Sequence, residues 1–168
     1  AGPGGQGWRE PGWYHSALFD FSSLDLSVPV KIYYNYGSDA QPSAVASAVV
    51  PASAGGSTML MVADVGTGDV DGSRGGGWQE GSREVHVGAY PGASTVMANV
   101  AQRHAELHAA GVPSMSVHIG DISYAEGYDL MWALFMRMIE PSALMGPYAV
   151  IQGNHERDWP RSDGLYMT

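Results

Sequence analysis

Cysteine is absent from the 168-residue chain, and lysine occurs once, as Lys31. Without cysteine the chain has no disulfide framework and no thiolate metal site. Its net charge of −9 gives it no basic surface for nucleic acid or for an anionic membrane, so neither is an expected partner. No apolar run approaches the roughly 20 residues that span a bilayer. The first seven residues are rich in glycine and show no signal-peptide pattern.

Apolar residues, by contrast, make up 45% of the chain, which also has 23 glycines and 10 prolines. This composition suits a medium-sized domain with a real core and many loops. Residues 1–52 have a β-like pattern, because residues 14–21 alternate in part and residues 28–36 are rich in Val, Ile and Tyr. Residues 41–56 predict a last weak strand followed by a linker.

From residue 57 the pattern changes to compact apolar runs separated by helical periodicity. Residues 58–63, 115–119 and 148–152 predict buried strands, and residues 95–110 and 129–140 predict helices. The second helix is apolar nearly all round, so we expect it to be buried, with an end or a kink at Pro141. Alternating strands and helices predict parallel βαβ units, in which ligands bind at the carboxyl ends of the strands.

Three short strings stand where these apolar runs end: ADVG at residues 63–66, GDISY at 120–124 and GNHE at 153–156. Each supplies an oxygen donor of the kind that hard cations prefer, and the last also contains a histidine. An acidic chain needs bound cations to act on a phosphate ester, and two cations about 3.5–4 Å apart can hold ester oxygens and activate water. The pattern therefore predicts a two-metal site for phosphoester hydrolysis.

The residue types at these positions suggest separate roles. Asp121 is the natural bridging ligand, since its strand is the middle one in sequence, and Asp64 is a terminal ligand. Tyr124 can turn back toward Asp121 as a phenolate, which favours a hard trivalent ion such as ferric iron. Asn154 offers an amide oxygen to the second metal. His155 diverges from its neighbour, so we expect it to contact the phosphoryl group or to protonate the leaving oxygen.

Aspartates and histidines outside the three strings are expected to have structural or solvent-exposed roles. Asp69 and Asp71 are alternatives to the first aspartate as ligands, but they lie beyond the strand end and are expected in a solvated loop. His104 and His108 are four residues apart, a spacing that can bind metal. No partner ligand is evident for them, so an ordinary amphipathic helix is favoured. His118 is expected to pack within its strand.

GDxxY at 120–124 followed by GNHE at 153–156 resembles the purple acid phosphatases of the calcineurin-like metallophosphoesterase superfamily. The strings HIGDISYAEGY (118–128) and GNHERDWP (153–160) are similar to the long two-domain subgroup, and GWREPGWYH (7–15) and YYNYG (33–37) to the end of its fibronectin-like domain. The resemblance implies an α/β fold, the βαβ-type N-terminal half of a calcineurin-like metallophosphoesterase sandwich, preceded by the C-terminal part of a fibronectin III-like β domain. The implied domains are residues 1–52 and 57–168, and the chain is expected to be a fragment.

The resemblance also implies a function. It makes Asp64, Asp121, Tyr124 and Asn154 metal ligands and His155 the catalytic residue that contacts substrate. The implied cofactor is a dinuclear metal centre of Fe3+ with Zn2+, Mn2+ or Fe2+, and the implied partners are small phosphorylated substrates. The implied activity is acid phosphatase, the hydrolysis of phosphate monoesters by a two-metal-activated hydroxide in the complete protein. The implied location is secreted, extracellular or vacuolar.

The sequence departs from the family pattern in places that bear on activity. Ala63 stands where the first motif has glycine, Ala133 stands where W-D-x-F has aspartate, and the strings V-x-x-H and G-H-x-H, with three histidine ligands, are absent. Two alternatives therefore stay open: a nucleotide pyrophosphatase or phosphodiesterase, and a truncated non-catalytic remnant or interaction module. From these 168 residues alone we expect at most weak binding of one metal and little or no phosphatase turnover.

Overall fold

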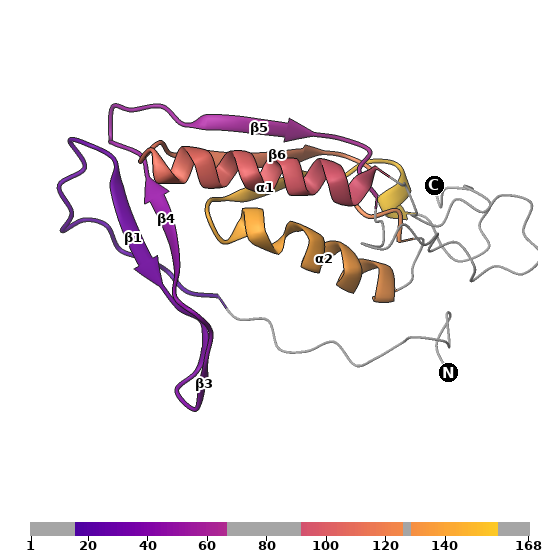
Figure 1. Ribbon diagram of the computed structural model, residues 1–168, viewed down its shortest axis with the longest axis horizontal. Helices are drawn as coiled ribbons and strands as arrows, with labels where there is room; N and C mark the ends of the chain where they lie inside the picture. The colour runs from indigo at the N-terminus through magenta and orange to yellow at the C-terminus, as the bar shows by residue number, and fades with distance from the viewer. Residues whose placement is uncertain (1–15, 67–91, 126–128, 158–168) are drawn as a thin grey trace, which may run out of the picture.

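The computed structural model describes residues 16–66, 92–125 and 129–157. Figure 1 shows a small β unit near the N-terminus, followed by a parallel sheet with two helices. The sequence strings at residues 7–15 and the residues after 157 lie outside the described ranges, as do Asp69 and Asp71. No helix within those ranges is long and apolar enough to cross a membrane.

The N-terminal β unit is antiparallel. Strand β1 (Val30–Tyr34) pairs with β4 (Ala46–Val50), and the short strand β2 (Gly37–Ser38) pairs with β3 (Gln41–Pro42). The residues of β1, VKIYY, are largely β-branched or aromatic, which suits a pleated strand. The strand predicted in residues 28–36 and the weak strand predicted after residue 41 are confirmed.

The strand interpretation of residues 14–21 is wrong where the structure describes that segment, because residues 16–21 form no strand. Two aspartate turns follow, at residues 20–22 and 25–27. The backbone N–H of Ser22 donates to Asp20 Oδ1 at 2.8 Å, and that of Ser27 donates to Asp25 Oδ1 at 2.9 Å. Such local side-chain bonds satisfy backbone donors that a strand would use in its ladder.

The second sheet is parallel, with strand order β5-β6-β7. Its strands are β5 (Thr58–Val62), β6 (Ser114–Ile119) and β7 (Tyr148–Ile151). Helix α1 (Ala93–Ala109) connects the first two strands, and α2 (Asp129–Ala143) connects the last two. The predicted βαβ arrangement is confirmed, and β6, which precedes Asp121, is the central strand.

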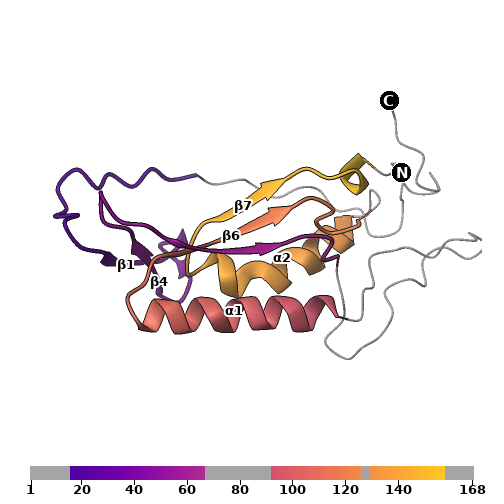
Figure 2. The ribbon, with the colours of Figure 1, turned by 90° about the horizontal axis from the view of Figure 1, so that it is seen from above.

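Both helices lie on one face of this sheet, which we call the covered face (Figure 2). Six buried residues form the core there, contributed by the helices and by the loops that follow β5 and β6: Val65, Ala93, Met97, Ile122, Phe135 and Ile139. The strand side chains beneath the helices are polar as well as apolar, since Ser116 and His118 of β6 are 1% and 0% exposed. Apolar burial on this face is the main source of stability.

The expectation that α2 is buried nearly all round is wrong. Phe135 is 1% exposed and Ile139 is 7% exposed, but Met136 is 55% exposed. A helix that lies against one face of a sheet can turn only one side of itself to the core, whatever the residues on its other side. Pro141 does not end α2, which continues to Ala143.

The opposite side of the sheet is the uncovered face, because no described residue forms a layer over it. Met59 and Met61 of β5 are 52% and 59% exposed, and Ile119 and Ile151 are 43% and 56% exposed. The parallel register places Met61 beside Val117 and Ile119 beside Ile151, so these side chains make one apolar strip. Parallel sheets are normally covered on both faces, and an apolar strip of this kind is typical of a surface that packs against something.

Polar contacts join the N-terminal β unit to the helices. The Tyr34 hydroxyl donates to the Leu144 carbonyl at 2.7 Å, just beyond α2, and that of Tyr36 donates to Glu140 at 3.3 Å. Ser47 of β4 is hydrogen bonded to His108 of α1, with 2.9 Å between Oγ and Nε2. The assignment of residues 1–52 to a separate fibronectin III-like domain stays a prediction.

Candidate metal centre

The loops that follow β5 and β6 run side by side at the carboxyl end of the sheet. The backbone N–H of Asp64 donates to the Gly120 carbonyl at 3.3 Å, and that of Gly66 donates to the Ile122 carbonyl at 3.1 Å. Residues 64 and 121 each come two positions after the last residue of their strand. The topology therefore brings the first two predicted strings together.

Both aspartates and Tyr124 have left-handed backbone conformations. Their φ angles are 51° for Asp64, 50° for Asp121 and 49° for Tyr124, and they are the only non-glycine residues with positive φ in the described part of the chain. Aspartate tolerates this conformation better than most residues, whereas tyrosine does not. Backbone of this kind costs about 1–3 kcal/mol per residue and gathers at functional sites.

The side chains of these three residues converge. The Tyr124 hydroxyl lies 3.2 Å from Asp64 Oδ1 and 3.3 Å from Asp121 Oδ2, so it can donate its one proton to either carboxylate. We call the two carboxylates and this phenol oxygen the oxygen cluster. Tyr124 is 6% exposed, Asp121 is half-buried and Asp64 is exposed, so the cluster opens to solvent on the Asp64 side.

The third string reaches the same place. It follows β7, and the short helix η1 (His155–Arg157) begins at its histidine. The His155 backbone N–H donates to Asp121 Oδ1 at 3.1 Å, and the imidazole lies against the Tyr124 ring with 4.5 Å between ring centroids. Asn154, the residue before it, is exposed. The contacts thus bring Asp64, Asp121, Tyr124 and His155 together at one edge of the sheet.

Glu156 was part of the third string but was given no role from the sequence. Its carboxylate accepts hydrogen bonds from three backbone N–H groups: Asp121 at 3.1 Å, Ile122 at 2.6 Å and Gly153 at 2.5 Å. The only sequence signal was its place in the string, because a glutamate that binds backbone has no pattern of its own.

Gly153 is needed for this arrangement because of space. A Cβ atom at this position would overlap the carboxylate and the backbone nitrogen of Asp121, and it would lie 3.0 Å from Glu156 Oε2. A Cβ on Gly120 would also be close, 3.1 Å from Gly153 Cα. The two glycines let the ends of β6 and β7 approach each other.

His118 lies buried on the covered face, as predicted for a strand residue. Its Nδ1 is 3.1 Å from the Tyr148 hydroxyl, and its Nε2 has no hydrogen-bond partner among the described residues. Burial lowers the pKa of His118, although the nearby carboxylates of Glu156 and Asp64 oppose this effect. Burial also raises the pKa of Tyr148 to about 12.

The two helical histidines serve packing. His104 is fully buried, with each ring nitrogen 2.7 Å from a serine hydroxyl of β6, Ser114 or Ser116. Burial lowers its pKa, so the neutral form is favoured. Across the described ranges, no group of three or more His, Asp or Glu side chains could hold a metal ion.

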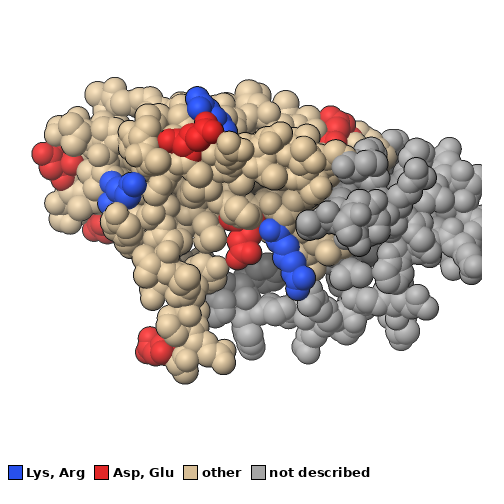
Figure 3. All heavy atoms as spheres, in the orientation of Figure 1, with Lys and Arg blue, Asp and Glu red and all other residues tan. Residues whose placement is uncertain are grey.

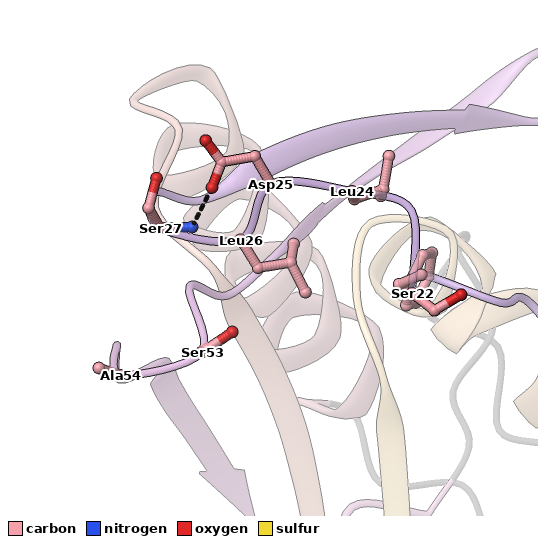
Figure 4. A pocket seen from close by; sticks show the side chains of 8 residues that line it. Ser22, Leu24, Asp25, Leu26, Ser27, Ser53 and Ala54 are labelled. Atoms are coloured by element: carbon pink, nitrogen blue, oxygen red, sulfur yellow. Dashed lines mark hydrogen bonds between the residues drawn. The ribbon is translucent and has the colours of Figure 1, made fainter.

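Two other surface features are unrelated to the cluster. Figure 4 shows a hollow lined by residues 21, 22, 24–27, 53 and 54, in which Asp25 accepts a hydrogen bond from the Ser27 N–H in its own turn. On the face seen in Figure 3, the Lys and Arg side chains do not gather into a basic patch, and acidic side chains lie close to some of them. Arg103 pairs with Glu106 at 2.9 Å. Neither feature suggests a second functional site.

Comparisons with known proteins agree with the resemblance drawn from the motifs. No family model matches the chain. "Probable inactive purple acid phosphatase 27" of Arabidopsis thaliana is 31% identical over 168 aligned positions, and the match covers 95% of this chain and 24% of the relative. "Probable inactive purple acid phosphatase 9" of the same plant is 33% identical over 158 aligned positions, and the match covers 92% of this chain and 21% of the relative.

A shorter match points to a different activity. "Nucleotide pyrophosphatase/phosphodiesterase" of Hordeum vulgare is 47% identical over 49 residues, 29% of this chain and 13% of that protein. Among solved structures, a purple acid phosphatase from yellow lupin seeds matches with a TM-score of 0.52 and 29% identity, over 72% of this chain and 19% of that one.

The first two relatives are much longer than this chain, which spans less than a quarter of either, 24% of one and 21% of the other. Sequence similarity covers most of the chain, and the fold similarity includes most of it as well. The predicted family is confirmed by both. The chain is therefore a purple acid phosphatase-like polypeptide, related to one part of the longer proteins of that family.

Proposed function

We propose that a protein of the relatives' length that contains this chain hydrolyses phosphate esters, with the chain supplying part of a dinuclear metal centre. The observation that carries the proposal is the convergence of the Tyr124 hydroxyl with the carboxylates of Asp64 and Asp121, within 3.2 and 3.3 Å. A solved structure of a yellow lupin protein named as a purple acid phosphatase, which the chain resembles, agrees with this chemistry.

The donor set fits such a centre. Two carboxylates and a phenol make an all-oxygen set, which suits a hard ion such as Fe3+. Asp121 follows the central strand, between the strings that contain Asp64 and Asn154, so it is the residue suited to bridging toward a second ion, Zn2+, Mn2+ or Fe2+. When bound, such a pair of ions neutralises charge on the ester and supplies an activated water.

His155 is the residue that we assign to the substrate. Its backbone N–H is bonded to Asp121 and its ring lies against Tyr124, so the imidazole is placed beside the oxygen cluster. From there it would contact the phosphoryl group or donate a proton to the leaving oxygen. The substrates proposed are small phosphate monoesters, and the proposed location is secreted or vacuolar, as the family resemblance implies.

The three histidine ligands missing from the sequence limit what the chain does alone. Its candidate ligands are the Asp64, Asp121, Tyr124 and Asn154 side chains, and neutral imidazoles that would hold a borderline divalent ion are not among them. We therefore expect weak binding of a single ion and little turnover from the 168-residue chain.

The test compares this chain with a chimera in which it replaces the matching segment of the yellow lupin phosphatase. Metal content and p-nitrophenyl phosphate hydrolysis are measured for both. We expect hydrolysis by the chimera alone, abolished by Asp121→Asn and unchanged by Glu106→Gln on the exposed side of α1. Two ions per chain and robust hydrolysis by the 168-residue chain would show that the ligand count is wrong.

His155→Ala in the same chimera separates substrate contact from metal binding. Loss of a general acid lowers turnover by about 10²–10⁴-fold, and metal content should stay nearly unchanged because His155 is not assigned as a ligand. A parallel loss of metal would instead make His155 part of the metal centre.

Two alternatives are judged by the same proteins. The barley match favours nucleotide pyrophosphatase or phosphodiesterase activity, which predicts faster hydrolysis of nucleotide diphosphate bonds or diesters than of p-nitrophenyl phosphate. The relatives named "probable inactive" favour a non-catalytic protein, which predicts a folded, metal-loaded chimera without turnover on any of these substrates.

A further inference from the structure

Glu156 joins the ends of two strands through their backbones. Its Oε2 accepts from Asp121 N–H at 3.1 Å, after β6, and from Gly153 N–H at 2.5 Å, after β7. Its Oε1 accepts from Ile122 N–H at 2.6 Å. Hydrogen bonds to an ionised acceptor are shorter and stronger than those between neutral groups. One side chain thus holds together the two loops that present Asp121 and His155.

The same short helix also holds the side chain of Asp121. The His155 backbone N–H donates to Asp121 Oδ1 at 3.1 Å, while Glu156, the next residue, accepts from the Asp121 backbone. The other carboxylate oxygen of Asp121, Oδ2, faces the Tyr124 hydroxyl at 3.3 Å. Asp121 is therefore held at its backbone and at one carboxylate oxygen by consecutive residues of η1, with the other oxygen directed into the oxygen cluster.

The backbone conformation explains why such support is needed. Asp121 has a φ of 50°, a left-handed conformation that is unfavourable for a non-glycine residue unless contacts offset its cost. The absence of a Cβ atom at Gly153 leaves the space that the Asp121 carboxylate and Glu156 share. The contacts of Glu156 supply the constraint at that point of the chain.

We propose that Glu156 is a positioning residue: its carboxylate holds the loops after β6 and β7 in register and thereby keeps the Asp121 carboxylate in the oxygen cluster. What the cluster binds rests on the proposed function, but the positioning itself does not. A residue that orients a ligand in this way typically changes metal affinity by about 10–100-fold when it is replaced.

Glu156→Gln, which removes the charge and keeps the size of the side chain, is the most direct test of this role. In Glu156→Gln one oxygen becomes an NH2 group, which cannot accept from the backbone N–H that faces it, so at least one of the three hydrogen bonds is lost. Glu156→Asp keeps two acceptor oxygens on a shorter side chain and should restore part of the effect. Glu106→Gln makes the same chemical change on an exposed residue of α1 and is the matched control.

Amide hydrogen exchange of the 168-residue chain, followed by NMR, tests the positioning without any metal. Glu156→Gln should speed exchange about tenfold at Asp121, Ile122 and Gly153, and also at His155, whose N–H reports on the Asp121 carboxylate. Exchange in β6 and α1 should not change. Asp121→Ala should speed exchange at His155 and leave Gly153 slow.

Titration with Tb3+, a hard trivalent probe excited through nearby tyrosine, tests the consequence for binding. Glu156→Gln should weaken binding about tenfold or more, Glu156→Asp less, and Glu106→Gln not at all. Unchanged exchange at His155 in Glu156→Gln, or faster exchange throughout the sheet, overturns the positioning role. Absence of Tb3+ binding by the unaltered chain contradicts the proposed metal site, and the exchange data then decide the role of Glu156 independently.

Discussion

The two faces of the β5-β6-β7 sheet share the same strands but differ in what lies over them. On the covered face, Phe135 of α2 and His118 of β6 are 1% and 0% exposed. On the uncovered face, Met59 and Met61 are 52% and 59% exposed, and no described residue packs over them as a layer. Side chains on the covered face are therefore part of the core, whereas those on the uncovered face are surface, and their contributions to stability should differ accordingly.

The largest contrast is expected from truncating one side chain on each face. Phe135→Ala removes a buried ring that packs against His118 and Trp132, with 5.7 and 6.2 Å between ring centroids. Such truncations lower the free energy of unfolding by about 3–5 kcal/mol. Met61→Ala, on the uncovered face, should change it by about 0.5 kcal/mol or less. Urea unfolding of both variants measures the difference, and equal losses would mean that the uncovered face is packed in solution.

Acid pH should lower the free energy of unfolding through two histidines that are buried on the covered face. Burial lowers the pKa of His104 and of His118 below the ordinary value for histidine, so the folded chain favours the neutral forms. The unfolded chain takes up these protons first as the pH falls. Stability is therefore complete above about pH 6.5 and is lost below it, by at most about 1.4 kcal/mol per pH unit for each histidine.

Unfolding in urea at pH 7.5, 6.5 and 5.5 measures this loss. His104→Gln should be less stable than the unaltered chain at pH 7.5, and its stability should fall less steeply toward pH 5.5. Replacing His104 disturbs its hydrogen bonds to two serines and lowers stability at every pH. The informative quantity is therefore how steeply the free energy of unfolding changes with pH. Rising stability on acidification would contradict the neutral assignment.

The smallest effect on stability is expected from charging the uncovered face. Met59→Lys with Met61→Lys places two cations on an edge strand, a common means of preventing association. The free energy of unfolding should change by about 0.5 kcal/mol or less for each substitution. Binding of an apolar dye and self-association at high concentration should both fall. A stability loss as large as that of Phe135→Ala would show that this face is buried in a stable assembly.

Local pattern was a good guide to the elements of the parallel unit. Three strands and two helices lie within a few residues of their predicted positions, and α1 ends before Gly111, whose φ of 70° suits a helix terminus. Pattern failed where the outcome depended on neighbours in space. The apolar residues all round α2 did not reveal which side would meet the sheet, and residues 16–21 gave no strand because aspartate turns form nearby.

The candidate site divides in the same way. Hard oxygen donors at the ends of successive strands were visible in the sequence because parallel strands present their carboxyl ends to one edge. The role of Glu156 was not visible, since its partners are backbone groups 34 and 35 residues away, apart from the nearby Gly153. The spacing of His104 and His108 allowed metal binding, but the sequence favoured an ordinary helix, and in the structure His104 is a buried partner of two serines.

By itself, then, the sequence determined the types of element, their order and the identity of the oxygen donors, because these depend on residues close together along the chain. Only the tertiary structure decided that Tyr124 reaches both Asp64 and Asp121, that Glu156 holds two loops together, and that one face of the sheet stays uncovered among the described residues. Those outcomes depend on distances between residues up to 60 positions apart. Such distances are set when the strands align in register and the helices pack on one face.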